Sequence, residues 1–304
     1  MPAAKPWAER WHGLKLRTSY ALVIALIVGV AAYGFDYYFA PAGERPFSPK
    51  HALLRSSGPL GLALGILGTL FFLVIFLYPI RKSFAWLRTR GNTRHWLDFH
   101  VLLGLTAPFI IVLHAAFKFG GLAGMAFWIM LLVSISGVVG RYLYSKIPRR
   151  LNAAELSLQE ARDEQARLTQ QLAEQKMFSS DMLRPLFHLP AEEKIRKQSI
   201  LIVLLEMVWG DFRRFYGVAA LRRRELGFAG WIASMGGLVR SGNEELERIV
   251  ALAKKQASIS QRLVFLTRTH QVFHLWHVVH KPFSYAFAVL VVIHIGVVLL
   301  FGIR

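Results

Sequence analysis

Runs of apolar residues, each about as long as the hydrocarbon core of a bilayer is thick, dominate the pattern of this 304-residue chain. Only helices or closed barrels can cross that core, because no water is present there to bond the backbone. Strict alternation of apolar and polar positions is absent, so the pattern predicts an all-α, polytopic membrane helix bundle. We expect about five transmembrane helices, at roughly Ala21–Ala40, Leu60–Ile80, Trp96–Phe117, Leu122–Tyr144 and Phe283–Ile303.

Basic residues collect beside alternate ends of these spans. One side carries the larger set, namely Lys5, Arg10, Lys15, Arg17, Arg81, Lys82, Arg88, Arg90, Arg94, Arg141, Lys146, Arg149 and Arg150. The opposite side has Arg45, Lys50, Arg55 and Lys118. Because cytoplasmic loops collect Lys and Arg, we expect a cytoplasmic N-terminus. We also expect a location in the inner (cytoplasmic) membrane of a bacterium. This asymmetry explains the net charge of +19, and we expect no nucleic-acid partner.

A long polar stretch between the fourth and fifth spans predicts a helical insert on the cytoplasmic side. We therefore divide the chain into transmembrane helices one to four (1–145), a cytoplasmic helical insert (146–270) and transmembrane helix five (271–304). The insert has no glycine-rich phosphate-binding motif, so no nucleotide or flavin site is expected in it. The chain also lacks cysteine, which excludes Cys-ligated iron–sulfur clusters, covalently attached haem and disulfides.

Within the insert, the spacing of apolar residues predicts helices. Heptad-like spacing from Leu151 to Leu172 predicts a first helix, as part of a short helical hairpin. A second helix is expected from Ala191 and includes the apolar stretch Ile200–Trp209, which is too short to span and is predicted to be buried or interfacial. Asn243 is expected to cap a long helix that continues into the fifth span.

Four histidines form two equally spaced pairs in the third and fifth spans. Thirteen residues separate His100 from His114, and thirteen separate His280 from His294. Fourteen steps at about 100° per residue return to within about 40° of the starting face and climb about 21 Å. Because both helices run in the same direction, His100 lies level with His280, and His114 lies level with His294.

Two facing histidine pairs at two depths predict two stacked haem b groups, non-covalently bound, with a neutral imidazole on each face of each iron. A single intramembrane histidine is often only a hydrogen-bonding residue between helices. Two helices that share spacing, direction and depth favour metal ligands instead. For the haem propionates, we expect cationic partners in Arg94, Arg141 and Lys281 at the inner level and Lys118 at the outer level.

The inner ligand of the fifth span has a competitor, His277, one turn before His280. Relative to His294, His280 lies within about 40° and His277 about 100° away, so helical phase favours His280. Pro282 could distort this turn and bring His277 inward, so the choice between the two stays open.

At these residues the chain resembles the ferric-reductase-like transmembrane superfamily, which includes the NADPH oxidases and bacterial haem-containing, quinone-linked relatives. The resemblance rests on the histidine pair of the third span, the equally spaced pair of the fifth, and a cytoplasmic N-terminus. It covers roughly Leu60–Tyr144 and His280–Ile303. In that family one histidine from each helix ligates each haem, which implies the same pairing by level. Members usually have a sixth span, and many carry a flavin and nicotinamide domain; neither is expected here.

These features together predict a membrane cytochrome b that carries electrons across the bilayer between a quinol, or a separate redox protein, and an acceptor. We expect an electron-transfer subunit of a membrane oxidoreductase rather than a complete enzyme, because no site for a hydride-carrying cofactor is expected. Two other functions stay open: a membrane-anchored sensor or scaffold, and a transporter with a His-lined path. His270, His274 and His277, on one helix face, could bind a transition metal, although a solvated polar face is the commoner explanation.

Overall fold

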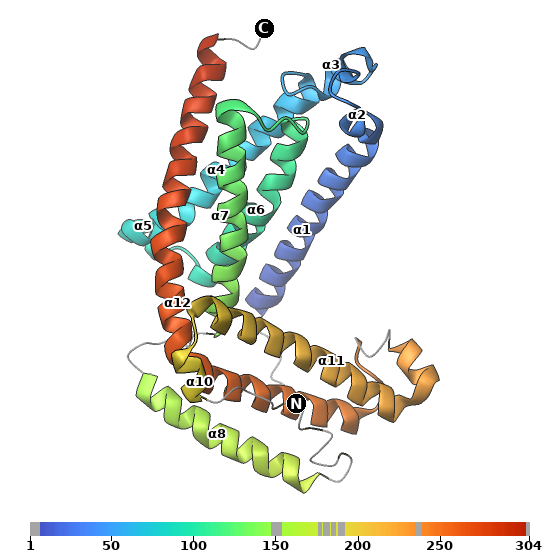
Figure 1. Ribbon diagram of the computed structural model, residues 1–304, viewed down its shortest axis with the longest axis vertical. Helices are drawn as coiled ribbons and strands as arrows, with labels where there is room; N and C mark the ends of the chain where they lie inside the picture. The colour runs from blue at the N-terminus through green and yellow to red at the C-terminus, as the bar shows by residue number, and fades with distance from the viewer. Residues whose placement is uncertain are drawn as a thin grey trace. The chain divides into compact units, whose positions relative to one another are not determined.

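The computed structural model describes residues 7–146, 154–175, 192–234 and 239–301, together with Phe178, Leu183 and Phe187 (Figure 1). The elements in these residues are helices, and none of them is a strand. Five helices are long and apolar enough to cross a membrane, which confirms the predicted all-α, polytopic membrane protein. The candidate spans are Trp7–Tyr33, His51–Arg81, Thr93–His114, Gly121–Lys146 and Gln271–Phe301.

The first span differs from the expected range. Helix α1 (Trp7–Tyr33) begins within the polar N-terminal arm and ends before Gly34, after which the short helix α2 (Phe35–Phe39) follows. A Cβ at Gly34 would lie 2.5 Å from the ring of Tyr38, so the close packing of this corner requires glycine. The sequence pattern missed this break because apolar residues continue across it.

The other elements around the membrane helices are short. They are η1 (Arg45–Phe47) and α3 (His51–Leu54) before α4 (Pro59–Ser83), and α5 (Ala85–Arg88) before α6 (Thr93–His114) and α7 (Gly121–Lys146). After α6 the backbone turns through Ala116 and Phe117, both with positive φ. Arg45 donates to the carbonyl oxygen of Ala116 at 2.5 Å and so holds this turn.

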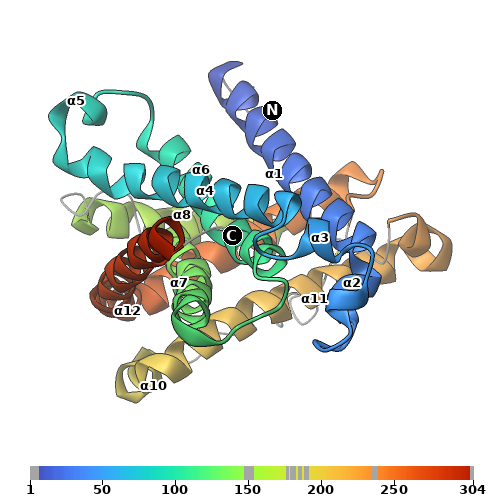
Figure 2. The ribbon, with the colours of Figure 1, turned by 90° about the horizontal axis from the view of Figure 1, so that it is seen from above.

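The chain forms two compact units. The first contains residues 1–141 and 276–304, and the second contains residues 142–275. In the first unit, a buried cluster joins α1, the short helices α2 and α3, α4 and α6; its members are Val30, Tyr37, Tyr38, Leu54, Leu64, Ile110, Leu113 and Ala116. A second cluster joins α6 to α7 through Ala107, Phe127 and Met130. Both views show α12 (Glu244–Phe301) passing beside α7, and Trp276 and His280 of α12 bond to Ser136 of α7 (Figure 1 and Figure 2).

A proline inside α6 leaves a backbone carbonyl without its usual partner, and a side chain of α7 supplies the missing hydrogen bond. Pro108 has no N–H, so the carbonyl of Gly104 lacks its usual helical donor. The hydroxyl of Ser134, on α7, donates to that carbonyl at 2.8 Å. Within a bilayer no water can make this bond, so the neighbouring helix must supply the donor.

The second unit packs α8 (Ala154–Glu174), α10 (Glu192–Lys197), α11 (Ile200–Ala233) and the first part of α12. Its core lies between α8, α11 and α12 and contains Leu172, Phe178, Leu183, Val218, Leu221, Leu246, Ile249, Val250 and Ala253. Side-chain hydrogen bonds run from α8 to α12, as between Gln165 and Ser260 at 2.8 Å. The helix that pairs with α8 in this way is therefore α12, which is distant from α8 in the sequence.

The helix boundaries of this unit refine the expected ones. The helix expected from Ala191 is interrupted, and α11 begins after Ser199, whose side chain accepts a hydrogen bond from the backbone N–H of Ile202. Asn243 caps α12 as expected, because its Oδ1 accepts from the N–H of Leu246 at 3.0 Å. The predicted heptad start at Leu151 lies outside the described residues.

Candidate functional site

His100, on α6, makes a hydrogen bond that depends on a proline in α4. Its Nδ1 lies 3.1 Å from the carbonyl oxygen of Ile75. That carbonyl lacks its usual helical donor because Pro79, four residues later, has no N–H. A carbonyl can only accept, so in the neutral imidazole Nδ1 carries the proton and Nε2 carries the lone pair. The ring of Tyr78 lies beside the imidazole, with the ring centroids 5.2 Å apart.

His114, one level away on the same helix, is held in the same manner. Its Nδ1 lies 2.8 Å from the carbonyl oxygen of Gly61 in α4. A Cβ at Gly65 would lie 2.6 Å from Cε1 of the ring, so α4 approaches the imidazole closely because this residue is glycine. The hydrogen bond again assigns the proton to Nδ1 and the lone pair to Nε2.

His280, on α12, donates to a side chain of α7. Its Nδ1 lies 2.7 Å from Oγ of Ser136, and that hydroxyl donates its own hydrogen to the carbonyl of Val133 at 2.8 Å. The serine oxygen therefore accepts from Nδ1, which leaves the lone pair on Nε2. Trp276 stacks on the imidazole with centroids 4.7 Å apart and donates to the carbonyl of Ser136 at 2.7 Å. A Cβ at Gly140 would lie 2.1 Å from the Trp276 ring, so this approach also requires glycine.

Each histidine pair predicted from the spacing consists of two imidazoles close enough to interact electrostatically. His280 lies within electrostatic range of His100, and His294 lies within electrostatic range of His114. Each pair takes one imidazole from α6 and one from α12. The structure thus brings together, level by level, the residues that the spacing pairs. Their role as haem ligands stays a prediction.

His277 is the competing inner residue, and it also lies within electrostatic range of His280, its neighbour on α12. The edge of its ring packs against Trp276, with the centroids 4.6 Å apart. Helix α12 continues through Pro282 to Phe301. The helical count from His280 to His294 therefore holds, and it keeps His280 as the predicted inner ligand.

The predicted propionate partners fall into two groups. The side chains of Arg94, Lys118 and Lys281 are exposed and form no ion pair with another described residue. Arg141 instead donates from Nη2 to Oδ1 of Asp98 at 2.8 Å. Binding of propionates by these four residues stays a prediction, and for Arg141 it would have to coexist with the ion pair.

Asp98 belongs to a polar cluster that sequence reasoning missed. Its buried carboxylate pairs with Arg141 and with Nε2 of His12, at 3.1 Å. His12, on α1, stacks on His95 with ring centroids 3.5 Å apart and planes 13° from parallel. A carboxylate inside a predicted span was the signal for this cluster, because ionisable groups are costly in a membrane and persist where they are paired or functional.

The described side chains show no metal site at the stripe of His270, His274 and His277. Among the described side chains, no group of three His, Asp or Glu residues converges on a point where a metal ion could bind. The side chain of His270 lies outside the described part of the chain, and that of His274 is exposed. A haem iron with two axial imidazoles needs only two histidines, so the pairs on α6 and α12 are a different kind of site.

Comparison of the whole chain with protein-family models, with curated proteins and with solved structures finds no match. The function must therefore be inferred from the geometry of the four histidines and their partners.

Proposed function

We propose that this chain is the membrane subunit of an electron-transfer system and binds two b-type haems between α6 and α12. His100 and His280 would ligate one haem, and His114 and His294 the other. One observation carries the proposal: His100, His114 and His280 each direct Nδ1 to an acceptor in the protein. Such a bond fixes the tautomer whose Nε2 can bind a metal, and it fixes the orientation of the ring.

The residues around the histidines fit this role. Two acceptors are main-chain carbonyls of α4, whose positions are set by the helix. The third is the hydroxyl of Ser136, whose position is set by its bond to Val133. A hydrogen bond from Nδ1–H also raises the basicity of Nε2, which strengthens ligation. Gly65 and Gly140 let neighbouring groups approach the imidazole of His114 and the ring of Trp276.

A haem iron with two imidazole ligands takes up and releases one electron without an open coordination position. Within each helix, the fourteen-residue repeat separates the two levels by about 21 Å, which covers most of a hydrocarbon core about 30 Å thick. The residues of α6 and α12 would therefore hold one redox centre near each face of the membrane. This arrangement suits electron transfer across the bilayer.

We infer the orientation and the partners from charge. The excess of Lys and Arg beside alternate span ends favours a cytoplasmic N-terminus and a cytoplasmic insert. We also propose that the membrane is the inner membrane of a bacterium. A quinol in the bilayer, or a separate redox protein that docks on the basic cytoplasmic side, would exchange electrons with the inner level. The resemblance to the ferric-reductase-like transmembrane superfamily agrees with this function. The chain would be a subunit of a membrane oxidoreductase.

An absorption spectrum of the purified chain tests the proposal. Protein from haem-replete cells should show a low-spin b-type spectrum, and a pyridine haemochrome assay should give about two haems per chain, one for each pair of imidazoles. The variant His100→Ala/His114→Ala removes one ligand at each level and should lose this spectrum. A stable, haem-free preparation of the unmodified chain would rule the proposal out and would favour a sensor or a transporter.

A further inference from the structure

Helix α11 exposes a continuous apolar face that no described part of the chain covers. Eight large apolar side chains on its first half are 44–70% exposed. They are Leu201, Ile202, Leu205, Val208, Trp209, Phe212, Phe215 and Tyr216. At about 100° per residue they fall within an arc of about 140°, and they extend about 22 Å along the helix. The opposite side of α11, including Val203 and Met207, is buried in the second unit.

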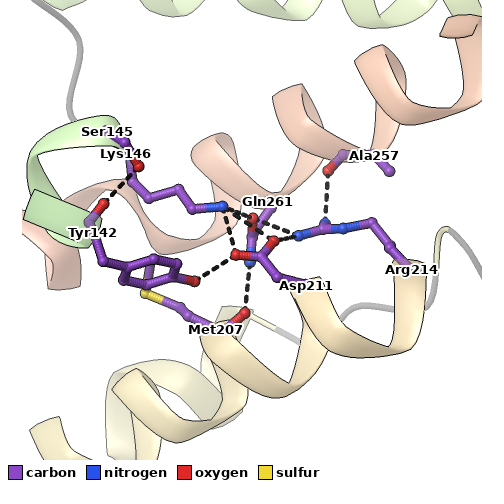
Figure 3. Close-up of polar contacts among 8 residues, drawn as sticks. All are labelled: Tyr142, Ser145, Lys146, Met207, Asp211, Arg214, Ala257 and Gln261. Atoms are coloured by element: carbon purple, nitrogen blue, oxygen red, sulfur yellow. Dashed lines mark hydrogen bonds and ion pairs between the residues drawn. The ribbon is translucent and has the colours of Figure 1, made fainter. Parts of the chain in front are cut away.

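The middle of this helix is bonded to the end of a membrane span. The carboxylate of Asp211 accepts a hydrogen bond from the hydroxyl of Tyr142 at 2.6 Å and forms an ion pair with Lys146 at 2.8 Å (Figure 3). Both partners lie in the last turns of α7, a candidate span that ends at Lys146. Arg214 and Gln261 complete the network. If the polar surface of the bilayer lies at the end of this candidate span, the network would bring the middle of α11 near that surface.

Charge on the exposed side of α11 is mainly positive. Arg213, Arg223 and Arg224 are exposed, against the single exposed carboxylate of Glu225. At about 100° per residue, Arg223 lies on the same side of the helix as the apolar face, two turns beyond Tyr216. A helix with aromatic and aliphatic residues on one face and arginines beside them is typical of segments that lie in the membrane interface. Arginine also favours a leaflet with anionic lipids.

We propose that α11 lies along the membrane surface, with the face from Leu201 to Tyr216 inserted among the headgroups and upper acyl chains of an anionic leaflet. The ligand is the bilayer itself, and neither haem nor any redox partner is needed for the contact. Leu205 and Phe212, at the centre of the arc, would be the deepest residues, while the arginines stay with the phosphates. The network around Asp211 would fix the rotation of α11 about its axis, so that this face points to the lipid.

The absence of cysteine from the chain allows a direct test. Full-length Phe212→Cys carries a nitroxide spin label at a single site, and Gln170→Cys, exposed on α8, serves as the matched control. Both are placed in lipid nanodiscs that contain phosphatidylglycerol. Collision with oxygen, which concentrates in lipid, is compared with collision with a water-soluble nickel chelate. The label at 212 should be reached by oxygen and protected from nickel, at a depth of about 5–10 Å, whereas the label at 170 should be reached by nickel.

Two results would overturn the proposal. Equal exposure of both labels to nickel would mean that the face is in water, and protection of the 212 label from both reagents would mean that a protein covers it. Val208→Cys, on the same face, is measured as a second site, so that one poorly folded variant does not decide the matter. Discs of phosphatidylcholine alone should place the label less deeply, and an unchanged depth would contradict the preference for anionic lipid.

Discussion

Gly65 of α4 and His114 of α6 lie so close that a Cβ on Gly65 would be 2.6 Å from Cε1 of the imidazole. An imidazole ring is rigid, so Gly65→Ala should displace His114, and the haem that we assign to the outer level should be lost or become high-spin. Gly68→Ala is the matched control, because its Cβ would meet the flexible end of Ile111 at 2.4 Å. Haem content and spin state, measured on both variants, check this. Equal loss from both variants would contradict it.

The pairing across α6 and α12 predicts which substitutions have the same effect. His114→Ala and His294→Ala should remove the same haem, because these two imidazoles lie within range of each other. Each variant should retain the haem that we assign to His100 and His280. Redox titration followed by absorption resolves the remaining centre, and its midpoint potential should be the same in the two variants. Different remaining centres would show that the pairing by level is wrong.

The inner ligand on α12 can be identified by two neighbouring substitutions. His280→Ala should abolish the inner haem, because this residue has the helical phase of His294 and lies within range of His100. His277→Ala should leave the absorption intact and at most shift the potential through the altered surroundings of His280. The reverse pattern would mean that the helix rotates near Pro282 and that His277 is the ligand.

Pro79 leaves the carbonyl of Ile75 available to His100, so replacing Pro79 should change the midpoint potential of the haem that we assign to the inner level. Pro79→Ala restores an N–H that competes for this carbonyl and weakens the bond from Nδ1. A weaker bond makes Nε2 less basic, which favours the reduced iron and should raise the midpoint potential of the inner centre. Pro108→Ala is the control, because the carbonyl concerned there bonds to a serine. An equal shift in both would point to helix distortion instead.

The insert should lose stability in acid through Glu247. Burial alone would raise the pKa of its carboxyl, but hydrogen bonds from Arg222 and Ser241 outweigh this and hold the pKa below the ordinary 4.5. Because the pKa is lowered in the folded state, the stabilisation is complete above pH 4.5 and is lost as the pH falls through the folded value. The protection of amides at the start of α12 from hydrogen exchange, relative to their intrinsic rates at each pH, should therefore decrease below this pH.

A pair of variants tests the role of Glu247. Glu247→Gln should reduce the stability of the insert at neutral pH by roughly 1–3 kcal/mol, because Arg222 keeps a buried guanidinium with a weaker partner. It should also remove most of the acid dependence. Glu245→Gln changes an exposed carboxylate in the same turn and should do neither. A similar acid profile in the Glu247 variant would mean that another carboxylate is responsible.

The membrane helices could be predicted because a long apolar run in a bilayer has few alternatives to a helix. The fourteen-residue spacing of the histidines likewise converts directly into depth and direction. Local breaks were harder to find. Gly34 ends α1 inside an apolar run, and Ser199 divides a predicted helix, because each depends on packing or capping by particular neighbours.

The partners of the histidines could not be predicted for a related reason. Two of the acceptors are backbone oxygens, which every residue possesses, and only the fold determines which one meets an imidazole. Pro79 was a visible signal, since a proline inside a span always leaves a carbonyl without its usual donor. The sequence does not tell which neighbouring helix supplies the replacement. Asp98 was visible too, but its pairing with His12 depends on how α1 packs against α6.

The hydrogen-bond acceptors of the histidines differ in how easily a mutation can change them. Main-chain oxygens of Ile75 and Gly61 orient the two histidines of α6, and a point mutation changes a side chain but leaves the peptide oxygen in place. The orientation of His280 depends on a hydroxyl at Ser136, which a single codon change can remove, lengthen or replace with an amide. Substitutions at position 136 can therefore change the orientation of the His280 imidazole in small steps. The orientations of His100 and His114 should stay the same, because no substitution removes their backbone acceptors.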